Sequence, residues 1–283
     1  MSLLSTPEPV PAVLARPHSL LEGPRFAPDG SLVYSDVIAG GLFSCPGGAG
    51  DEIVELLRGR RGVGGVVAHA DGGWVISGRS LVHLQPDDGQ RELLSDPDVP
   101  GYNDLGAGPG GELLAGELRY RPMSGEEPRE GRLLAIGADG AVRVLSEQVR
   151  WPNGIGVSPD GETVYVSDYA RQGVLAVPYA GGAAEIFAES PRGSADGLAL
   201  DVEGGVWIAL GEGGGVARFD AGGALQEIVE VPASFVSSLA FGGPDMRDVL
   251  ISTADNRVEP ALGGTLLLAR SEVPGLPLAP VVV

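Results

Sequence analysis

The stretch NGIGVSPDGETVYVSD, residues 153–168, holds two short apolar runs separated by a turn. The apolar residues on either side of the turn alternate or run together, as they do in half-buried strands. Pro159-Asp160-Gly161 lies between the runs and supplies a glycine for the turn position that needs a positive φ. The sequence therefore predicts a β-hairpin over residues 153–168.

This unit recurs along the chain. In five copies a turn glycine lies eight residues after the first residue, and these copies begin at Glu22, Gly64, Asn103, Asn153 and Asp196. A sixth copy near Ser238 is degenerate and has Pro244-Asp245 at its turn. Further strand-like runs, such as residues 40–47 and 173–180, separate the hairpins. Each period thus contains about four strands in roughly 40 to 50 residues, which is the size of a propeller blade.

Six such periods fill residues 17–270, and no long pattern of helical period competes with them. The preceding segment VPAVLAR, residues 10–16, is expected to form the outer strand of the last blade. The prediction is an all-β protein: a six-bladed β-propeller of four-stranded antiparallel blades, closed by an N-terminal strand, in a single domain over residues 1–283.

Composition narrows the classes of function. The net charge is −19 and all 19 basic residues are arginine, so no basic surface for nucleic acid is expected. Without lysine, neither a Schiff-base lysine nor a P-loop lysine exists. Cys45 is the only cysteine, which excludes an intramolecular disulfide and a cysteine metal cluster.

The same considerations predict the compartment and the partners. The N-terminal residues 1–21 lack the basic and apolar regions of a signal peptide. No apolar run approaches about 20 residues, the length that spans a membrane. We expect a cytoplasmic protein, monomeric or homodimeric, that acts on a small molecule and has neither a membrane nor a nucleic acid as partner.

Polar residues occupy the first position of four of the six repeats: Glu22, Asn103, Asn153 and Asp196. Equivalent positions of a propeller lie at equal height around the central channel, so these side chains should converge near one end of it. Asn-Gly and Asp-Gly are also common turn signals, which is the alternative interpretation. Here, however, they begin a strand and lie eight residues before the turn. Four oxygen-donating side chains in one ring favour a hard divalent cation.

The segments LLEGPRF (20–26), GYNDL (101–105), RWPNGIGVSPDGETVYVSD (150–168) and SADGLALDVEGGVWIA (194–209) resemble the SMP-30, gluconolactonase and luciferin-regenerating-enzyme family. The resemblance covers nearly the whole chain. It implies a six-bladed propeller that hydrolyses lactones or related esters with one divalent cation: calcium first, with magnesium, manganese, zinc or iron as alternatives. The implied metal ligands are Glu22, Asn153 and Asp196, and Asp196 is also the implied general base. Asn103 is implied to contact the metal through water or to hold substrate.

The chain departs from this family in its implied substrate pocket. Sugar-lactonase members often carry an arginine where this chain has Gly101, and their Gly-Thr-Met is replaced here by Gly116-Glu117-Leu118. The metal site therefore matches the family more closely than the substrate pocket does.

Other residues near these positions are candidates for substrate binding. They are Tyr102, Glu117, Arg119, Trp151 and His18. His18 would border the pocket and shuttle protons, or be a solvated loop histidine. Trp151 would form an apolar wall, or pack in a joint between blades. Residues 121–132 form a long polar insertion that would act as a lid or remain a surface loop.

These observations together predict a metal-dependent lactonase or esterase in which Asp196, or a water that it orients, delivers the nucleophile. One alternative is a non-catalytic propeller that binds a ligand or a protein. Another is an enzyme of the same fold that acts on a phosphotriester or a biosynthetic intermediate, since fold does not determine chemistry.

Overall fold

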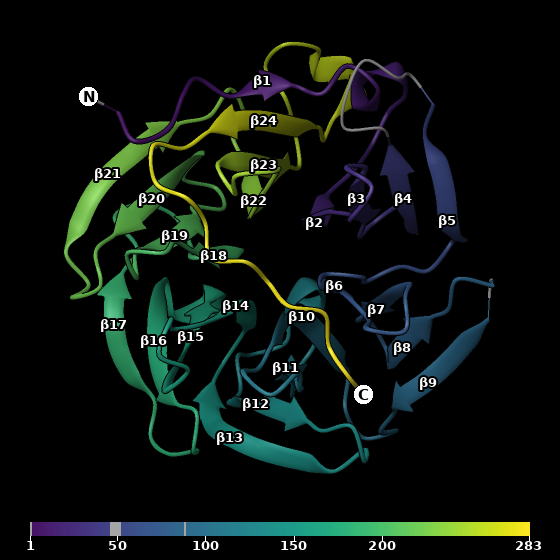
Figure 1. Ribbon diagram of the computed structural model, residues 1–283, viewed down its shortest axis with the longest axis vertical. Coiled ribbons are helices and arrows are strands. Elements are labelled where there is room, and N and C mark those ends of the chain that lie inside the picture. Colours follow the sequence, from purple (N-terminus) through teal and green to yellow (C-terminus); the bar gives the residue numbers. More distant parts are fainter. Residues whose placement is uncertain (1, 46–51, 88) are drawn as a thin grey trace.

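The computed structural model describes residues 2–45, 52–87 and 89–283. Over these residues the chain forms six four-stranded antiparallel sheets that follow one another around a central axis (Figure 1). The six-bladed propeller predicted from the repeats is confirmed. Within the described ranges the only helical segments are four single-turn 3-10 helices, namely η1 (Val13–Ala15), η2 (Pro122–Ser124), η3 (Tyr169–Arg171) and η4 (Pro260–Leu262).

Each of the first five blades is built from four consecutive strands, with the first strand innermost. The first blade contains β2 (Leu21–Phe26), β3 (Leu32–Asp36), β4 (Gly41–Cys45) and β5 (Val54–Arg58). The second contains β6 (Val66–Ala68), β7 (Trp74–Ile76), β8 (Leu81–Leu84) and β9 (Gln90–Leu94). The third contains β10 (Gly101–Ala107), β11 (Leu113–Leu118), β12 (Gly131–Ile136) and β13 (Val142–Val149).

The remaining blades continue around the ring. The fourth contains β14 (Pro152–Val157), β15 (Thr163–Asp168), β16 (Gly173–Pro178) and β17 (Glu185–Glu189). The fifth contains β18 (Leu198–Leu200), β19 (Val206–Ala209), β20 (Gly215–Phe219) and β21 (Leu225–Glu230). The sixth contains β22 (Val236–Gly242), β23 (Asp248–Thr253), β24 (Leu266–Arg270) and, as its outer strand, β1 (Glu8–Pro9).

The ring is closed by an N-terminal strand, as predicted, but not by the predicted residues. Glu8 and Pro9 pair with Leu268 and Leu267, whereas the segment VPAVLAR that follows contains the 3-10 turn η1. Val10 makes the last ladder hydrogen bond, from its N–H to the Leu266 carbonyl at 2.9 Å. Pro11 has no N–H to continue the ladder, so the strand ends there.

The core consists of apolar clusters that lie between neighbouring blades. In the joint between the fifth and sixth blades, the fully buried Trp207 meets Phe241 edge to face with the ring centroids 5.7 Å apart. In the joint between the sixth and first blades, Val10 and Val13 pack with Leu21 and Leu250, so the turn η1 serves as core filler. Blade-to-blade packing therefore holds the inner strands at a common height. In the described part of the chain, none of the helices is both long and apolar enough to cross a membrane.

Candidate functional site

The predicted polar residues all lie where the inner strands begin. Glu22 is in β2, Asn103 in β10 and Asn153 in β14, and Asp196 lies two residues before β18. Glu22, Asn153 and Asp196 are buried, whereas Asn103 is partly exposed. All of them therefore lie at the same end of the central channel.

Hydrogen bonds from blade to blade connect this end of the channel. The Asn103 side-chain amide donates to the Pro152 carbonyl at 2.9 Å, which links the third blade to the fourth. The Gly154 N–H donates to the Asp196 carbonyl at 3.2 Å, which links the fourth blade to the fifth. The fifth, sixth and first blades are joined in the same way through Ser237, whose carbonyl accepts from Gly197 and whose hydroxyl donates to the Leu21 carbonyl. The site residues thus belong to a nearly continuous ring of backbone contacts.

Four of the inner strands carry a β-bulge at this height. The pairing register shifts between Glu22 and Arg25 in β2, between Tyr102 and Leu105 in β10, between Pro152 and Ile155 in β14, and between Val236 and Ser238 in β22. Each bulge inserts an extra residue opposite the second strand and re-aims the side chains there. The bulges let consecutive residues, rather than alternate ones, face the channel.

The glycines that follow Asn153 and Asp196 are required by close packing and not by a turn. Neither Gly154 nor Gly197 has a positive φ. A Cβ at Gly154 would lie 2.0 Å from the Leu198 nitrogen, and one at Gly197 would lie 2.1 Å from the Ser238 hydroxyl oxygen. The Asn-Gly and Asp-Gly pairs are therefore places where one inner strand passes directly against the next.

Three carboxyl groups influence one another at this site. Burial raises the pKa of Glu22 well above its usual value, and the charges of Asp196 and Asp104 raise it further. Burial also raises the pKa of Asp196, with contributions from Asp104 and Glu212. Burial raises the pKa of Asp104 to about 6, against the opposing pull of Arg25. Removal from water and mutual repulsion both disfavour the ionised forms, so a bound positive charge would be required to keep all three carboxyl groups ionised.

The donor set fits a divalent cation. Glu22 Oε2 and Asp196 Oδ1 are enclosed and have no hydrogen-bond partner. An unpaired, buried carboxylate oxygen is costly unless a cation binds it. In the described ranges, no three His, Cys, Asp or Glu side chains cluster tightly enough to hold a metal by themselves. A cation here would therefore use the amide oxygen of Asn153 together with carboxylate oxygens, a donor set that suits a hard ion.

Sequence reasoning missed Asp104 and Arg25. Strict alternation along β10 allows only one of Asn103 and Asp104 to face the channel, but the bulge exposes both to it. Asp104 occupies the position at which other repeats have Gly65, Gly154 and Gly197. An acidic residue at a position otherwise held by glycine against the channel was the signal that could have found it.

Two of the candidates in the third blade, Tyr102 and Glu117, are buried and already make contacts within the fold. Tyr102 is 2% exposed and its ring packs in the apolar cluster between the second and third blades. Glu117 is also buried, and its carboxylate accepts hydrogen bonds from Arg119 Nε at 2.6 Å and from Arg132 Nε at 2.6 Å. The carboxylate of Glu117 is thus already satisfied by two guanidinium groups. Arg119 keeps 41% of its side chain exposed.

Trp151 belongs to a group of aromatic rings at this end of the fourth blade. Its ring lies 4.5 Å from that of Tyr169 and 6.5 Å from that of Tyr120. The Tyr169 hydroxyl donates to Glu212 at 2.9 Å. Burial, followed by the charge of Asp196, raises the pKa of Tyr169, which places this hydroxyl within electrostatic range of Asp196. Trp151 and Tyr169 are both partly exposed and offer an aromatic surface beside the site.

The histidines lie in packed environments. The His18 ring is enclosed between Tyr34 and Phe43, and burial lowers its pKa to about 4. His18 is therefore neutral near pH 7. His69 and His83 stack on each other with ring centroids 3.8 Å apart.

The polar insertion of residues 121–132 is mostly exposed and contains the turn η2.

The metal-free protein should lose stability as the pH rises from about 4 to about 7. Asp104 has a pKa of about 6 in the fold, which is above its ordinary 3.8. The folded state then binds this proton more tightly than the unfolded state, so the stabilisation is lost as the pH passes through 6. Asp104→Asn removes this ionisation. In EDTA it should unfold at a temperature several degrees above that of the wild type at pH 8, for a difference of up to about 3 kcal/mol.

The control for this experiment is the same pair of proteins at about pH 3, below the ordinary pKa of 3.8, where Asp104 is protonated in both the folded and the unfolded state and the two unfolding temperatures should converge. Added Ca²⁺ should raise the unfolding temperature of the wild type at pH 8. Equal pH dependence in the two metal-free proteins would show that Asp104 is not a destabilising charge.

Comparison with known proteins agrees with this architecture. The family model described as the SMP-30/gluconolactonase/LRE-like region matches residues 20–255. A pentonolactonase of Haloferax volcanii, XacC, is 33% identical over 245 residues, which cover 82% of this chain and 81% of that protein. A 6-deoxy-6-sulfogluconolactonase of Pseudomonas putida is 28% identical over 287 residues, which cover 95% of this chain and 97% of that protein.

A solved structure with the same fold is that of a regucalcin from Agrobacterium tumefaciens, which is described as a calcium-binding protein. It superposes with a TM-score of 0.83 over 99% of this chain and 98% of that one, at 24% identity. The likeness extends around the whole ring.

Proposed function

Because this chain belongs to the SMP-30/gluconolactonase/LRE-like family, we propose that it hydrolyses a small-molecule lactone or related ester with the help of one divalent cation. The two relatives named as lactonases support lactone hydrolysis. The observation that carries the metal-dependent form of the proposal is the pair of buried carboxylate oxygens, Glu22 Oε2 and Asp196 Oδ1, that have no partner in the protein.

Glu22, Asn153 and Asp196 would hold the cation, and Asp104 adds negative charge close to it. A cation bound there would polarise the carbonyl of the ester and stabilise negative charge on its oxygen. We take Ca²⁺ first, because the donors are all oxygen and because a protein of the same fold is described as calcium-binding. Mg²⁺, Mn²⁺, Zn²⁺ and iron are the alternatives to compare with it.

Asp196 is the proposed general base. With its Oδ1 on the cation, the second oxygen of its carboxylate would accept a proton from a water molecule. Burial and its acidic neighbours raise its pKa towards the range in which a carboxylate is an effective base, whereas a bound cation lowers it again. The blade-to-blade hydrogen bonds at Gly154 and Gly197 hold the backbone on either side of Asp196 in place.

Asn103 and Trp151 are proposed to position the substrate. The side-chain nitrogen of Asn103 donates to the Pro152 carbonyl, so the side-chain oxygen of Asn103 is the atom that would contact substrate. Trp151 and Tyr169 would cover one side of the substrate ring. The paired Arg119 and Glu117 lie at the end of β11 and would contribute to the outer part of the pocket. His18 is not proposed to bind substrate, because its ring is enclosed by aromatic side chains.

The test is acid release in a pH-stat from a panel of lactones and esters, supplied with Ca²⁺ and the other cations in turn. The panel should include pentonolactones, hexonolactones with and without a sulfonate group, and simple aliphatic lactones. We expect at least one sugar-acid or aliphatic lactone to be turned over well above the spontaneous rate. If every lactone and ester fails with every cation, the non-catalytic ligand-binding propeller becomes the better explanation.

A further inference from the structure

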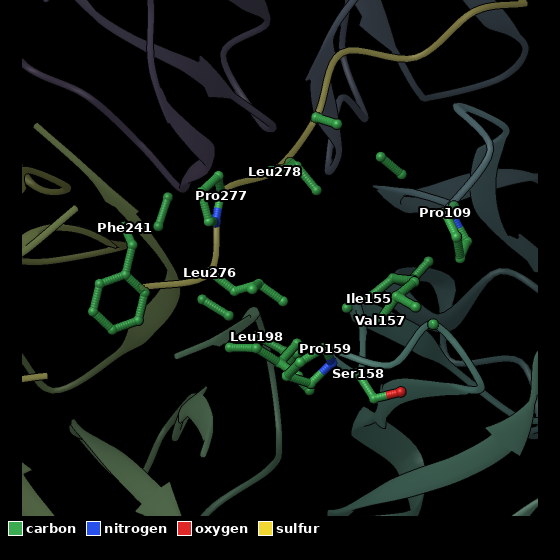
Figure 2. Close-up of a pocket in the computed structure, with 18 of the residues that line it drawn as sticks. Pro109, Ile155, Val157, Ser158, Pro159, Leu198, Phe241, Leu276, Pro277 and Leu278 are labelled. Carbon is green, nitrogen blue, oxygen red and sulfur yellow. The ribbon is translucent and has the colours of Figure 1, made fainter. Parts of the chain in front are cut away.

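A cavity lies at the end of the channel opposite the carboxylate site, which consists of Glu22, Asp104 and Asp196. It has a volume of about 350 Å³ and is lined mainly by apolar side chains, including Ile155, Val157, Leu198, Phe241 and Leu276 (Figure 2). Asn153 lies near the start of β14, and Val157, four residues later at the end of this strand, lines the cavity. At about 3.3 Å per residue, Asn153 and the cavity are separated by roughly 13 Å along the channel. Its volume falls within the range of small-molecule sites, about 300–1,000 Å³.

The chain after β24 forms a strap over this mouth. In Figure 1 the strap crosses the central opening from the sixth blade towards the second and third blades. At one end the Leu276 N–H donates to the Leu200 carbonyl at 2.8 Å, and at the other the Val281 N–H donates to the Ala68 carbonyl at 2.9 Å. Between these anchors, residues 277–280 are exposed. Pro277 and Pro280 have no N–H, and the N–H groups of Leu278 and Ala279 are not bonded to the described backbone. The strap is thus fixed at both ends and unsupported over the cavity.

Arg25 brings a positive charge to the inner wall of the cavity. Its side chain lines the cavity, and its Nε is enclosed without a hydrogen-bond partner. Another nitrogen of the group, Nη1, donates to the Pro24 carbonyl at 2.8 Å. Asp160 also lines the cavity, but its carboxylate accepts hydrogen bonds from the Ser158 hydroxyl and the Glu162 N–H. The apolar walls and the Arg25 guanidinium form a site for a molecule that has an anionic head and an apolar body.

We infer that this strap-covered cavity is a second binding site, separate from the carboxylate site, for a small apolar monoanion such as a medium-chain carboxylate. The carboxylate head would bind Arg25, because a guanidinium and a carboxylate make charge-assisted hydrogen bonds. The apolar tail would lie between Ile155, Leu198 and the strap. This inference does not depend on the lactonase proposal, since binding can be measured without turnover.

Calorimetric titration of the protein with octanoate, compared with 1-octanol, tests the inference. Octanoate should bind about tenfold or more tightly than octanol, the scale of one charge-assisted hydrogen bond. Ala240→Phe should abolish binding of both, because Ala240 lines the cavity. Its matched control is Ala221→Phe, in an exposed turn outside the lining, which should bind both as the wild type does.

Arg25→Met tests whether the guanidinium of Arg25 binds the carboxylate head. The substitution keeps an apolar stem and removes the charge, so octanoate affinity should fall to that of octanol while octanol affinity stays unchanged. Unchanged octanol binding also shows that the variant is folded. The inference is overturned if octanoate binds Ala240→Phe as tightly as the wild type, which would place it elsewhere, for example on a cation at the carboxylate site. It is also overturned if wild-type protein does not prefer octanoate to octanol.

Discussion

Asp196→Asn should lower kcat for lactone hydrolysis by about a hundredfold or more, the usual effect of removing a general base. The substitution keeps an oxygen donor and nearly the same volume, but it removes both the negative charge and the proton acceptor. If Asp196 is the base, the loss should persist at cation concentrations that restore full occupancy of the site. The measurement is kcat for wild type and variant, titrated with Ca²⁺, Mg²⁺ and Mn²⁺.

Asn153→Asp is the matched variant for this experiment. It keeps oxygen ligation and adds a charge, so it alters cation binding without removing the proposed base. Its kcat at saturating cation should stay closer to that of the wild type than the kcat of Asp196→Asn does. A near-wild-type kcat for cation-saturated Asp196→Asn would rule out the base role and leave Asp196 as a ligand alone.

Removal of divalent cations should reduce lactone hydrolysis by about a thousandfold or more, the upper range for losing a main stabiliser of an oxyanion. Without a cation, negative charge that develops on the substrate would lie close to Glu22, Asp104 and Asp196. Burial, and then the charges of Asp196 and Asp104, already raise the pKa of Glu22. The experiment is dialysis against EDTA, elemental analysis to verify the metal-free state, and a rate assay before and after each cation is restored.

Two controls make this result specific. Circular dichroism should show that the metal-free protein keeps its β structure, since the apolar joints between blades do not depend on the site. Restored activity should follow occupancy of the site, measured by equilibrium dialysis, and Glu22→Gln should need more cation to reach the same occupancy. Full activity in verified metal-free protein would contradict the metal-dependent mechanism.

Parts of the site followed from the order of residues along the chain. The constant offset of eight residues between the first repeat position and the turn glycine placed Glu22, Asn153 and Asp196 at equivalent positions. Since a propeller relates equivalent positions by rotation about its axis, a local repeat was enough to predict their shared height. Their roles as ligands and base remain predictions that the experiments above test.

Other parts depended on contacts between blades. Asp104 was missed because the prediction used only the first position of each repeat, whereas the bulge between Tyr102 and Leu105 brings the second position of the third repeat to the site as well. His18 is of a residue type that often serves in active sites, but Tyr34 and Phe43 enclose its ring, and burial lowers its pKa to about 4. Neither the bulge nor the enclosure leaves a periodic trace in the sequence.

The sequence by itself determined the number of blades, their hairpin register and the polar ring, because each of these repeats at short range within one unit. The tertiary structure alone decided that residues 8–9 close the ring and that the strap covers the cavity opposite the carboxylate site. It also decided that Arg25 lies between the carboxylate site and this cavity. These features join segments such as Leu276 and Leu200 that lie far apart along the chain. Such contacts form only once the blades have packed around a common axis, so no local pattern of residues encodes them.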